Sequence, residues 1–249
     1  MSNKFIQRYI SSELAHFVGG NKSTKEKQYK VLVKIIREGL LTPTHQDPEM
    51  AGYLATLLNG QISNNKMFMP CVVCFCDIPI GDQYIHMSKY GQFGLSFRKE
   101  FLIQQGANPV FYIAKNSRIN ISEVASTVIR ATSRADYFDR MFPMYHNLID
   151  ELKNLVNQNS SLKQRSLSLK KLNEIDLFLK RYIFSFLIFF DDAKKDADHK
   201  NYYMEREWRI FGNIKFKIKD VYRIILPKSY AKLFREDVPE FIGQVSFAD

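Results

Sequence analysis

The stretch Tyr202-Tyr203-Met204-Glu205-Arg206-Glu207-Trp208-Arg209-Ile210-Phe211 combines four charged side chains with strand-prone residues and holds the only tryptophan of the chain. Successive side chains of a strand point to opposite faces. The spacing therefore predicts that Glu205 and Glu207 share one face, while Trp208 and Ile210 anchor the other face in a core. Two carboxylates held in this way suit acid–base or charge-stabilising chemistry. An edge strand with solvated charges and one buried tryptophan is the other interpretation.

The pattern that precedes this stretch is helical. Leu148, Leu152 and Val156 recur at four-residue spacing, and a second long helix is expected from Leu162 to Phe190. We therefore expect a helical insertion over residues 122–192 within a single domain of residues 1–249. The apolar end of the second helix is about half as long as a membrane span and has charges on both sides, so it predicts a buried core segment and no membrane contact.

The first part of the chain supplies the remaining strands. Residues 14–18 predict a strand that carries His16, and a helix follows from Tyr29, with Ser23 or Thr24 as its cap and Gly39 as its end. Further strands are expected at 69–79, 93–97, 110–113, 214–219 and 221–226. The sequence thus predicts an α+β domain with a central, mostly antiparallel, split sheet built from both ends of the chain.

Composition favours an anionic partner. The chain has 249 residues, 45% of them hydrophobic, and a formal net charge of +10 with a pI of about 9.4. This balance suits nucleic acid or an acidic protein. Lys215, Lys217 and Lys219 alternate with apolar residues and predict a basic strand face, for which a solvated sheet edge is the alternative.

The cysteines and the N-terminus predict a cytoplasmic protein. The three cysteines are odd in number and clustered, and the first residues lack the apolar region of a signal peptide. Cys71-x-x-Cys74 has no second cysteine pair that would complete a zinc site, so no metal site is predicted.

Five motifs in this order resemble the AbiGi family of bacterial abortive phage-resistance proteins. They are His16-Phe17, Ile35-Ile36-Arg37-Glu38-Gly39-Leu40-Leu41, Cys74-Phe75-Cys76-Asp77-Ile78-Pro79, Tyr90-Gly91-x-Phe93-Gly94-Leu95-Ser96-Phe97 with Asn108-Pro109-Val110, and Glu205-Arg206-Glu207-Trp208-Arg209. The resemblance implies phage defence in a toxin–antitoxin setting, with this component as the antitoxin. A cognate toxin or antitoxin would then be its partner.

A second resemblance concerns chemistry. A strand with His16, a helix followed by Gly39-Leu40 and a late strand with glutamates are similar to the ADP-ribosyltransferase fold. The resemblance implies NAD as cofactor, with His16 at the nicotinamide ribose. Glu205 or Glu207 would stabilise the oxocarbenium-like charge, and a nucleic acid or a protein would be the acceptor. Candidates for the rest of the NAD site are Phe17, Tyr90 and Ser96.

Three functions from different classes follow. The first is an NAD-dependent transferase in phage defence, which requires His16 and Glu207 in one cleft. The second is a non-catalytic antitoxin or regulator that binds a cognate toxin or nucleic acid through its basic surface. The third is a nuclease in which Asp77, Glu205 and Glu207 hold a metal ion, although no local spacing of metal ligands supports it.

Overall fold

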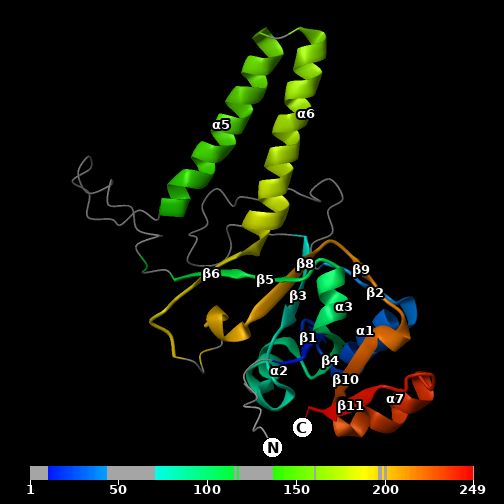
Figure 1. Ribbon diagram of the computed structural model, residues 1–249. Helices are drawn as coiled ribbons and strands as arrows, with labels where there is room; N and C mark the ends of the chain where they lie inside the picture. The colour runs from blue at the N-terminus through cyan, green and yellow to red at the C-terminus, as the bar shows by residue number, and fades with distance from the viewer. Residues whose placement is uncertain are drawn as a thin grey trace, which may run out of the picture. The chain divides into compact units, whose positions relative to one another are not determined.

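The computed structural model describes residues 11–43, 71–114, 117, 137–159, 161–195, 198 and 201–248. The chain divides into two compact units. Unit 1 comprises residues 1–44, 72–110 and 195–249, and unit 2 comprises residues 45–71 and 111–194. Unit 1 therefore combines elements from early and late parts of the chain, blue and red in Figure 1. It holds every candidate site residue.

Unit 1 is built around a seven-stranded sheet with the strand order β11-β10-β4-β1-β3-β8-β5. Its neighbouring strands are antiparallel except for β10 and β11, which confirms the predicted α+β class and the mostly antiparallel sheet. The elements of this unit are β1 (Glu13–Val18), α1 (Lys25–Glu38), β2 (Leu40–Leu41), β3 (Val72–Cys76), α2 (Tyr84–Tyr90), β4 (Phe93–Arg98), α3 (Lys99–Gln104), β5 (Asn108–Pro109), β8 (Glu207–Phe211), β9 (Ile214–Lys215), β10 (Val221–Leu226), α7 (Ala231–Asp237) and β11 (Gln244–Phe247).

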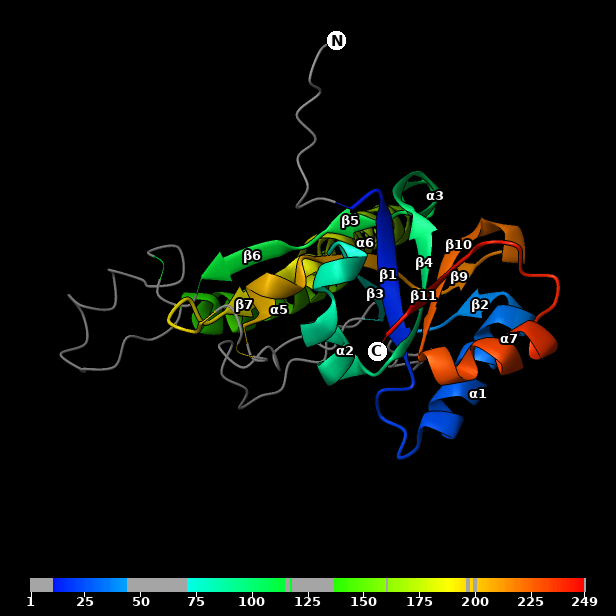
Figure 2. The same cartoon turned by 90° about the horizontal axis from the view of Figure 1, so that it is seen from below.

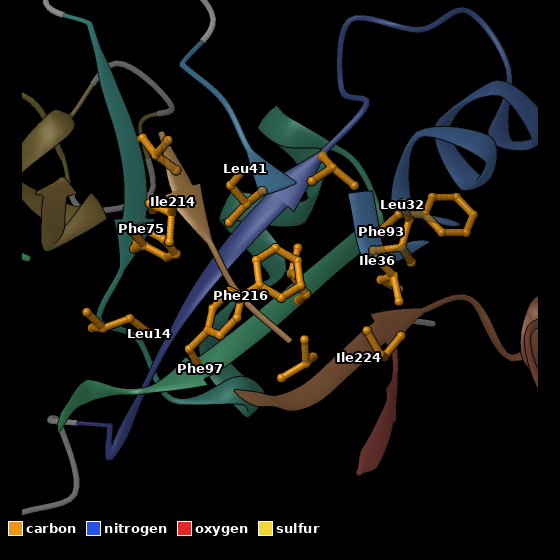
Figure 3. Close-up of a cluster of buried hydrophobic side chains, with 14 of the residues drawn as sticks. Leu14, Leu32, Ile36, Leu41, Phe75, Phe93, Phe97, Ile214, Phe216 and Ile224 are labelled. Atoms are coloured by element: carbon orange, nitrogen blue, oxygen red, sulfur yellow. The ribbon is translucent and has the colours of Figure 1, made fainter. Parts of the chain in front are cut away.

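One face of the sheet, here called the core face, carries the main hydrophobic cluster. Leu14, Phe75 and Phe97 lie on three different strands and are fully or almost fully buried. Phe97 contacts the rings of Phe75, Phe101 and Phe216. Figure 3 shows Leu14, Phe75, Phe97 and Phe216 together with other side chains of this cluster. Burial of so much apolar area is the main stabilising term of the unit.

Helix α1 covers the core face with Tyr29, Leu32, Val33 and Ile36. Its ends follow the predicted signals. The Thr24 hydroxyl accepts a hydrogen bond from the Lys27 N–H, and Gly39 closes the helix with a left-handed φ of 61°. Helix α7 lies beside α1 (Figure 2), where the Tyr29 hydroxyl donates to Asp237 over 2.6 Å.

The opposite face, here called the polar face, carries a smaller apolar cluster and most of the charged side chains of the sheet. Ala15, Cys76 and Ile225 are buried there, and Phe17 and Met87 pack against them. Because Met87 belongs to α2, this helix covers part of the polar face.

Unit 2 contains a two-stranded parallel sheet and a helical hairpin. Its elements are β6 (Phe111–Ala114), α5 (Tyr137–Asn159), α6 (Leu162–Phe178) and β7 (Leu187–Phe190). Asp176 on α6 accepts a hydrogen bond from the Tyr145 hydroxyl of α5 over 2.8 Å, which ties the two helices together, and it also pairs with Lys180 one turn further along its own segment. Over the part of the chain that the structure describes, no helix is long and apolar enough to cross a membrane.

The insertion is only partly as predicted. The two helices are present, but the expectation of a helix that reaches Phe190 is wrong. After α6 the chain passes through a π-helical turn, Leu179–Ile183, and then forms β7 beside β6. The β-branched and aromatic residues of Leu187–Phe190 favour a strand once a partner strand is available. Residues 122–136 of the expected insertion lie outside the described residues.

The focal stretch also differs from the prediction in its first half. Tyr202–Glu205 forms a 3-10 helix, and Arg206 has a left-handed φ of 46° before β8 begins at Glu207. Trp208 and Ile210 pack on the core face as predicted. The expected strand at 110–113 is displaced by one residue to β6, and only Ile214 and Lys215 of 214–219 are in a strand.

Candidate functional site

The candidate site lies on the polar face, where neighbouring strands bring functional side chains into one row. Directly paired residues of antiparallel strands have their side chains on the same face. The registers pair Ser96 with Ala15, Ala15 with Cys76, and Cys76 with Glu207. Ser96 on β4 and Glu207 on β8 therefore point to the same side of the sheet, at the two ends of a row of four adjacent strands.

Glu207 is buried and pairs with an arginine on its own strand. The Arg209 Nε donates to Glu207 Oε1 over 2.7 Å, and both side chains are largely shielded from water. Cys74, on the neighbouring strand, lies directly opposite Arg209. The atoms packed around the Cys74 sulfur reduce its hydration, which raises the pKa of the thiol, and the Glu207 charge raises this pKa further. Cys74 is nevertheless accessible to solvent, so the polar face is open at this residue.

Glu205 is held by helix α2 rather than by the sheet. The left-handed turn at Arg206 ends the 3-10 helix, and Glu205 bonds to residues of α2. Lys89 forms an ion pair with Glu205, and the Tyr90 hydroxyl donates to the same carboxylate over 2.9 Å. Burial raises the pKa of Glu205, while Lys89 counteracts the rise. Burial, followed by the Glu205 charge, raises the pKa of Tyr90 and keeps its hydroxyl protonated.

His86 lies next to Tyr90 on the side of the site that α2 forms. It lies one helical turn before Tyr90, and its ring contacts those of Tyr90 and Phe17 at centroid distances of 5.7 and 6.4 Å. Burial lowers the pKa of His86 to about 4, and the Lys89 charge lowers it as well, so the imidazole is neutral at pH 7. It offers hydrogen-bonding groups to this face without a charge.

Ser96 is engaged in a separate network on the same face. Its hydroxyl donates to Glu13, and the Arg223 guanidinium bonds to both oxygens of the Glu13 carboxylate at distances between 2.9 and 3.1 Å. Such a two-pronged contact fixes both side chains. Ser96 thus helps to join β1, β4 and β10.

His16 lies on the core face, away from the two glutamates. It follows Ala15 in β1, so its side chain points to the opposite side from Ala15, Cys76 and Glu207. Its ring contacts Phe75 in the main core, with the centroids 5.6 Å apart. The expectation that His16 and Glu207 share one cleft is therefore wrong, because the registers of β1, β3 and β8 fix them on opposite faces.

His16 also marks the place where the sheet opens between β1 and β3. These strands share a single residue pair, Ala15 with Cys76. At the next position the His16 Nδ1–H donates to the Cys74 carbonyl over 2.7 Å, in place of a backbone ladder. Burial lowers the pKa of His16, while the hydrogen bond to the Cys74 carbonyl raises it. His16 thus joins β1 to β3 through its side chain.

The six residues predicted for a site are thus divided between the two faces. Phe17, Tyr90, Ser96, Glu205 and Glu207 all belong to the polar face, and His16 does not. The residues present do not fit NAD in the predicted arrangement, because each carboxylate already has a cationic partner and the ribose-binding histidine points elsewhere.

Asp77, the third carboxylate of the nuclease alternative, is used in another way. It pairs with Lys99 over 2.7 Å and accepts a hydrogen bond from the Ser11 N–H. Within the described ranges, no group of three or more His, Cys, Asp or Glu side chains could hold a metal ion.

Lys89, His86 and Cys74 are site residues that the sequence analysis missed. A usable signal was present on α2, since His86, Lys89 and Tyr90 have the spacing that places side chains on one side of a helix. The apolar neighbours of Cys74 favour burial on both faces of the strand. Its exposure depends on the opening between β1 and β3, which no local pattern predicts.

Comparisons with known proteins agree on one family. A model of the family described as "Putative abortive phage resistance protein AbiGi, antitoxin" matches residues 59–237. The Abortive phage resistance protein AbiGi of Lactococcus lactis subsp. cremoris is 25% identical over 146 residues, which cover 55% of this chain and 49% of that protein. The chain thus spans about half the length of this relative. No solved structure matches the chain. With the family match extending over most of its length, from before β3 to the end of α7, the chain belongs to the AbiGi family of abortive phage-resistance proteins.

Proposed function

We propose that this protein acts in abortive phage resistance as a non-catalytic antitoxin, and that it binds an acidic partner, a cognate toxin, in the cytoplasm. The observation that carries the proposal is the position of His16. In a transferase of the expected kind, an imidazole and a carboxylate contact the same bound NAD molecule. Here His16 and Glu207 point to opposite faces of the sheet.

The ion pairs of the two glutamates support the same proposal. Glu207 is paired with Arg209, and Glu205 with Lys89 and Tyr90, and these groups are largely shielded from water. A carboxylate that is already neutralised stabilises a developing positive charge less well than a free one. These contacts instead join β8 and the 3-10 helix before it to their neighbours, which is a structural role.

The surface proposed for the partner is the lysine stripe, defined as Lys215, Lys217 and Lys219. These side chains are exposed and alternate with Ile214, Phe216 and Ile218, which pack on the core as predicted. None of the three lysines forms an ion pair with another described residue. Closely spaced cations without ion-pair partners in their own chain attract an anionic surface on another molecule. Surfaces of opposite charge also accelerate the association of two proteins.

The deciding experiment is expression in cells, alone and together with the product of the adjoining gene. An antitoxin is harmless alone and suppresses the toxicity of that product, and Glu207→Gln leaves both results unchanged if the protein remains folded. Toxicity of the wild type alone that Glu207→Gln relieves would contradict the proposal.

The lysine stripe is tested by charge reversal. Lys215→Glu combined with Lys217→Glu should abolish suppression of the toxin and reduce binding at least tenfold, because two attractive contacts become repulsive. The matched control is Lys25→Glu with Lys27→Glu on α1, which makes the same change of charge at exposed positions elsewhere. Equal effects of the two double variants would exclude the lysine stripe as the specific binding surface. If the stripe binds nucleic acid and does not bind the toxin, the toxin is excluded as its partner.

An NAD-dependent ADP-ribosyltransferase is the second candidate, favoured by one observation. Five of the six predicted site residues share the polar face with the solvent-accessible Cys74. Incubation of the purified protein with NAD tests this candidate. Release of nicotinamide by the wild type but not by Glu207→Gln would establish it.

A further inference from the structure

Helix α5 has two apolar stripes, and only one of them faces its partner helix. The inner stripe contains Tyr145, Ile149 and Val156, of which Ile149 is buried and Tyr145 bonds to Asp176 on α6. The outer stripe consists of Met144, Leu148, Leu152 and Leu155, with exposed fractions between 36 and 60%. Residues three and four apart lie together on a helix, so these four form one continuous strip.

Helix α6 repeats this arrangement. Its inner positions, facing α5, include Leu172 and the buried Asp176. Its outer stripe contains Leu167, Ile175, Phe178 and, in the turn that follows, Tyr182, with exposed fractions between 54 and 57%. Four large side chains are again left in water although the helix already has a partner.

The two outer stripes lie on the same side of the hairpin. In each helix an outer position directly precedes an inner one, as Leu148 precedes Ile149 and Ile175 precedes Asp176. In each helix the outer stripe is therefore rotated by about 100° about the helix axis from the inner positions, and the rotation has the same sense along the chain in both helices. Because α5 and α6 run antiparallel (Figure 1), the same rotation brings both stripes to one side. The hairpin therefore presents one broad apolar face, here called the outer face.

The outer face is large enough for a stable interface. Aromatic side chains carry roughly 150–250 Å² of surface, and leucine, isoleucine and methionine lie at about the lower end of this range. Eight such side chains about half exposed, six of them aliphatic, provide on the order of 600 Å², which approaches the roughly 800 Å² that each partner contributes to a standard protein interface. Monomeric proteins seldom leave a patch of this size uncovered.

The charges on this face favour a second copy of the same chain. The outer stripe of α5 is bordered by Glu151, and the outer stripe of α6 is interrupted by Lys171. Neither forms an ion pair with another residue in the described parts of the chain. Asp176 contacts both Tyr145 and Lys153, which places Glu151 within about one helical turn of the level of Lys171.

We propose that two copies of this chain pair through their outer faces and form a four-helix bundle. A two-fold axis parallel to the hairpin places α5 of one copy over α6 of the other, so that Glu151 meets Lys171 of the second copy at two symmetric positions. Four helices around one shared apolar core are a stable arrangement. Dimerisation is independent of the lysine stripe, which belongs to unit 1.

Sedimentation equilibrium of the full-length protein at micromolar concentrations tests the proposal. The wild type should be a dimer. Leu148→Asp should weaken the dimer about thirtyfold or more, because a charge replaces an apolar side chain near the centre of the interface. Asn154→Asp is the matched control on the same helix, since it adds the same charge at an exposed position away from the outer face. A monomeric wild type would overturn the proposal.

A charge exchange identifies the second copy as the occupant. Glu151→Lys and Lys171→Glu should each weaken the dimer about fivefold, and the double variant should restore the wild-type dissociation constant. Circular dichroism verifies that the variants retain their helix content. If the dimer of the double variant is weakened by the sum of the two single changes in binding free energy, the proposed pairing of α5 with α6 is contradicted.

Discussion

Because the folded protein keeps the His86 imidazole neutral, the protein should become less stable in mild acid. His86 is 6% exposed, and burial, aided by the Lys89 charge, lowers its pKa to about 4 in the folded protein. In the unfolded chain the pKa is about 6.5. Between these two values the unfolded state binds a proton that the folded state does not, so the free energy of unfolding falls as the pH decreases from 6.5 toward 4.

The magnitude follows from the two pKa values. One pKa unit corresponds to about 1.4 kcal/mol, so the full loss below pH 4 would be on the order of 3 kcal/mol, and about 2 kcal/mol should be lost between pH 7 and pH 5. This is a large part of the stability of a typical domain.

Urea unfolding at pH 7 and pH 5 measures this loss in the wild type and in His86→Phe. The phenylalanine keeps a ring beside Phe17 and Tyr90 but cannot be protonated. The difference between the two pH values should be about 2 kcal/mol smaller in the variant, whereas other titrating groups contribute equally to both proteins. The same pH dependence in the two proteins would refute the reasoning.

Three further results are expected. Phe97→Ala should reduce the free energy of unfolding by about 3–5 kcal/mol in a urea titration, because Phe97 is fully buried among three other rings, and a loss below about 1 kcal/mol would contradict this packing. Gly39→Ala should lower the thermal unfolding midpoint, because φ is +61° and the added Cβ would lie 2.4 Å from the Phe216 carbonyl oxygen. Gly106→Ala has the strain of a positive φ (+94°) but open space around its Cβ, so it should lower the midpoint less. Cys74 should react with iodoacetamide at pH 7 at least tenfold more slowly than free cysteine, because its raised pKa disfavours the thiolate, and peptide mass spectrometry would reveal a faster reaction.

The local patterns of the sequence were sufficient for the elements with strong signals. Thr24 and Gly39 mark the ends of α1 because capping depends on the residue itself. Trp208 and Ile210 share the core face because side chains alternate along a strand. Leu187–Phe190 was assigned to a helix instead, because a short apolar run suits either structure until a partner strand is present.

The sequence by itself thus determined the α+β class, the ends of α1 and the alternation of lysines with apolar residues at 214–219, because these depend on neighbouring residues. Only the tertiary structure decided which of the predicted site residues meet. A change of one residue in the register of a strand moves every side chain to the other face. The pairing of Ala15 with Cys76, which lie about sixty residues apart, therefore places Glu207 on the polar face and His16 on the core face.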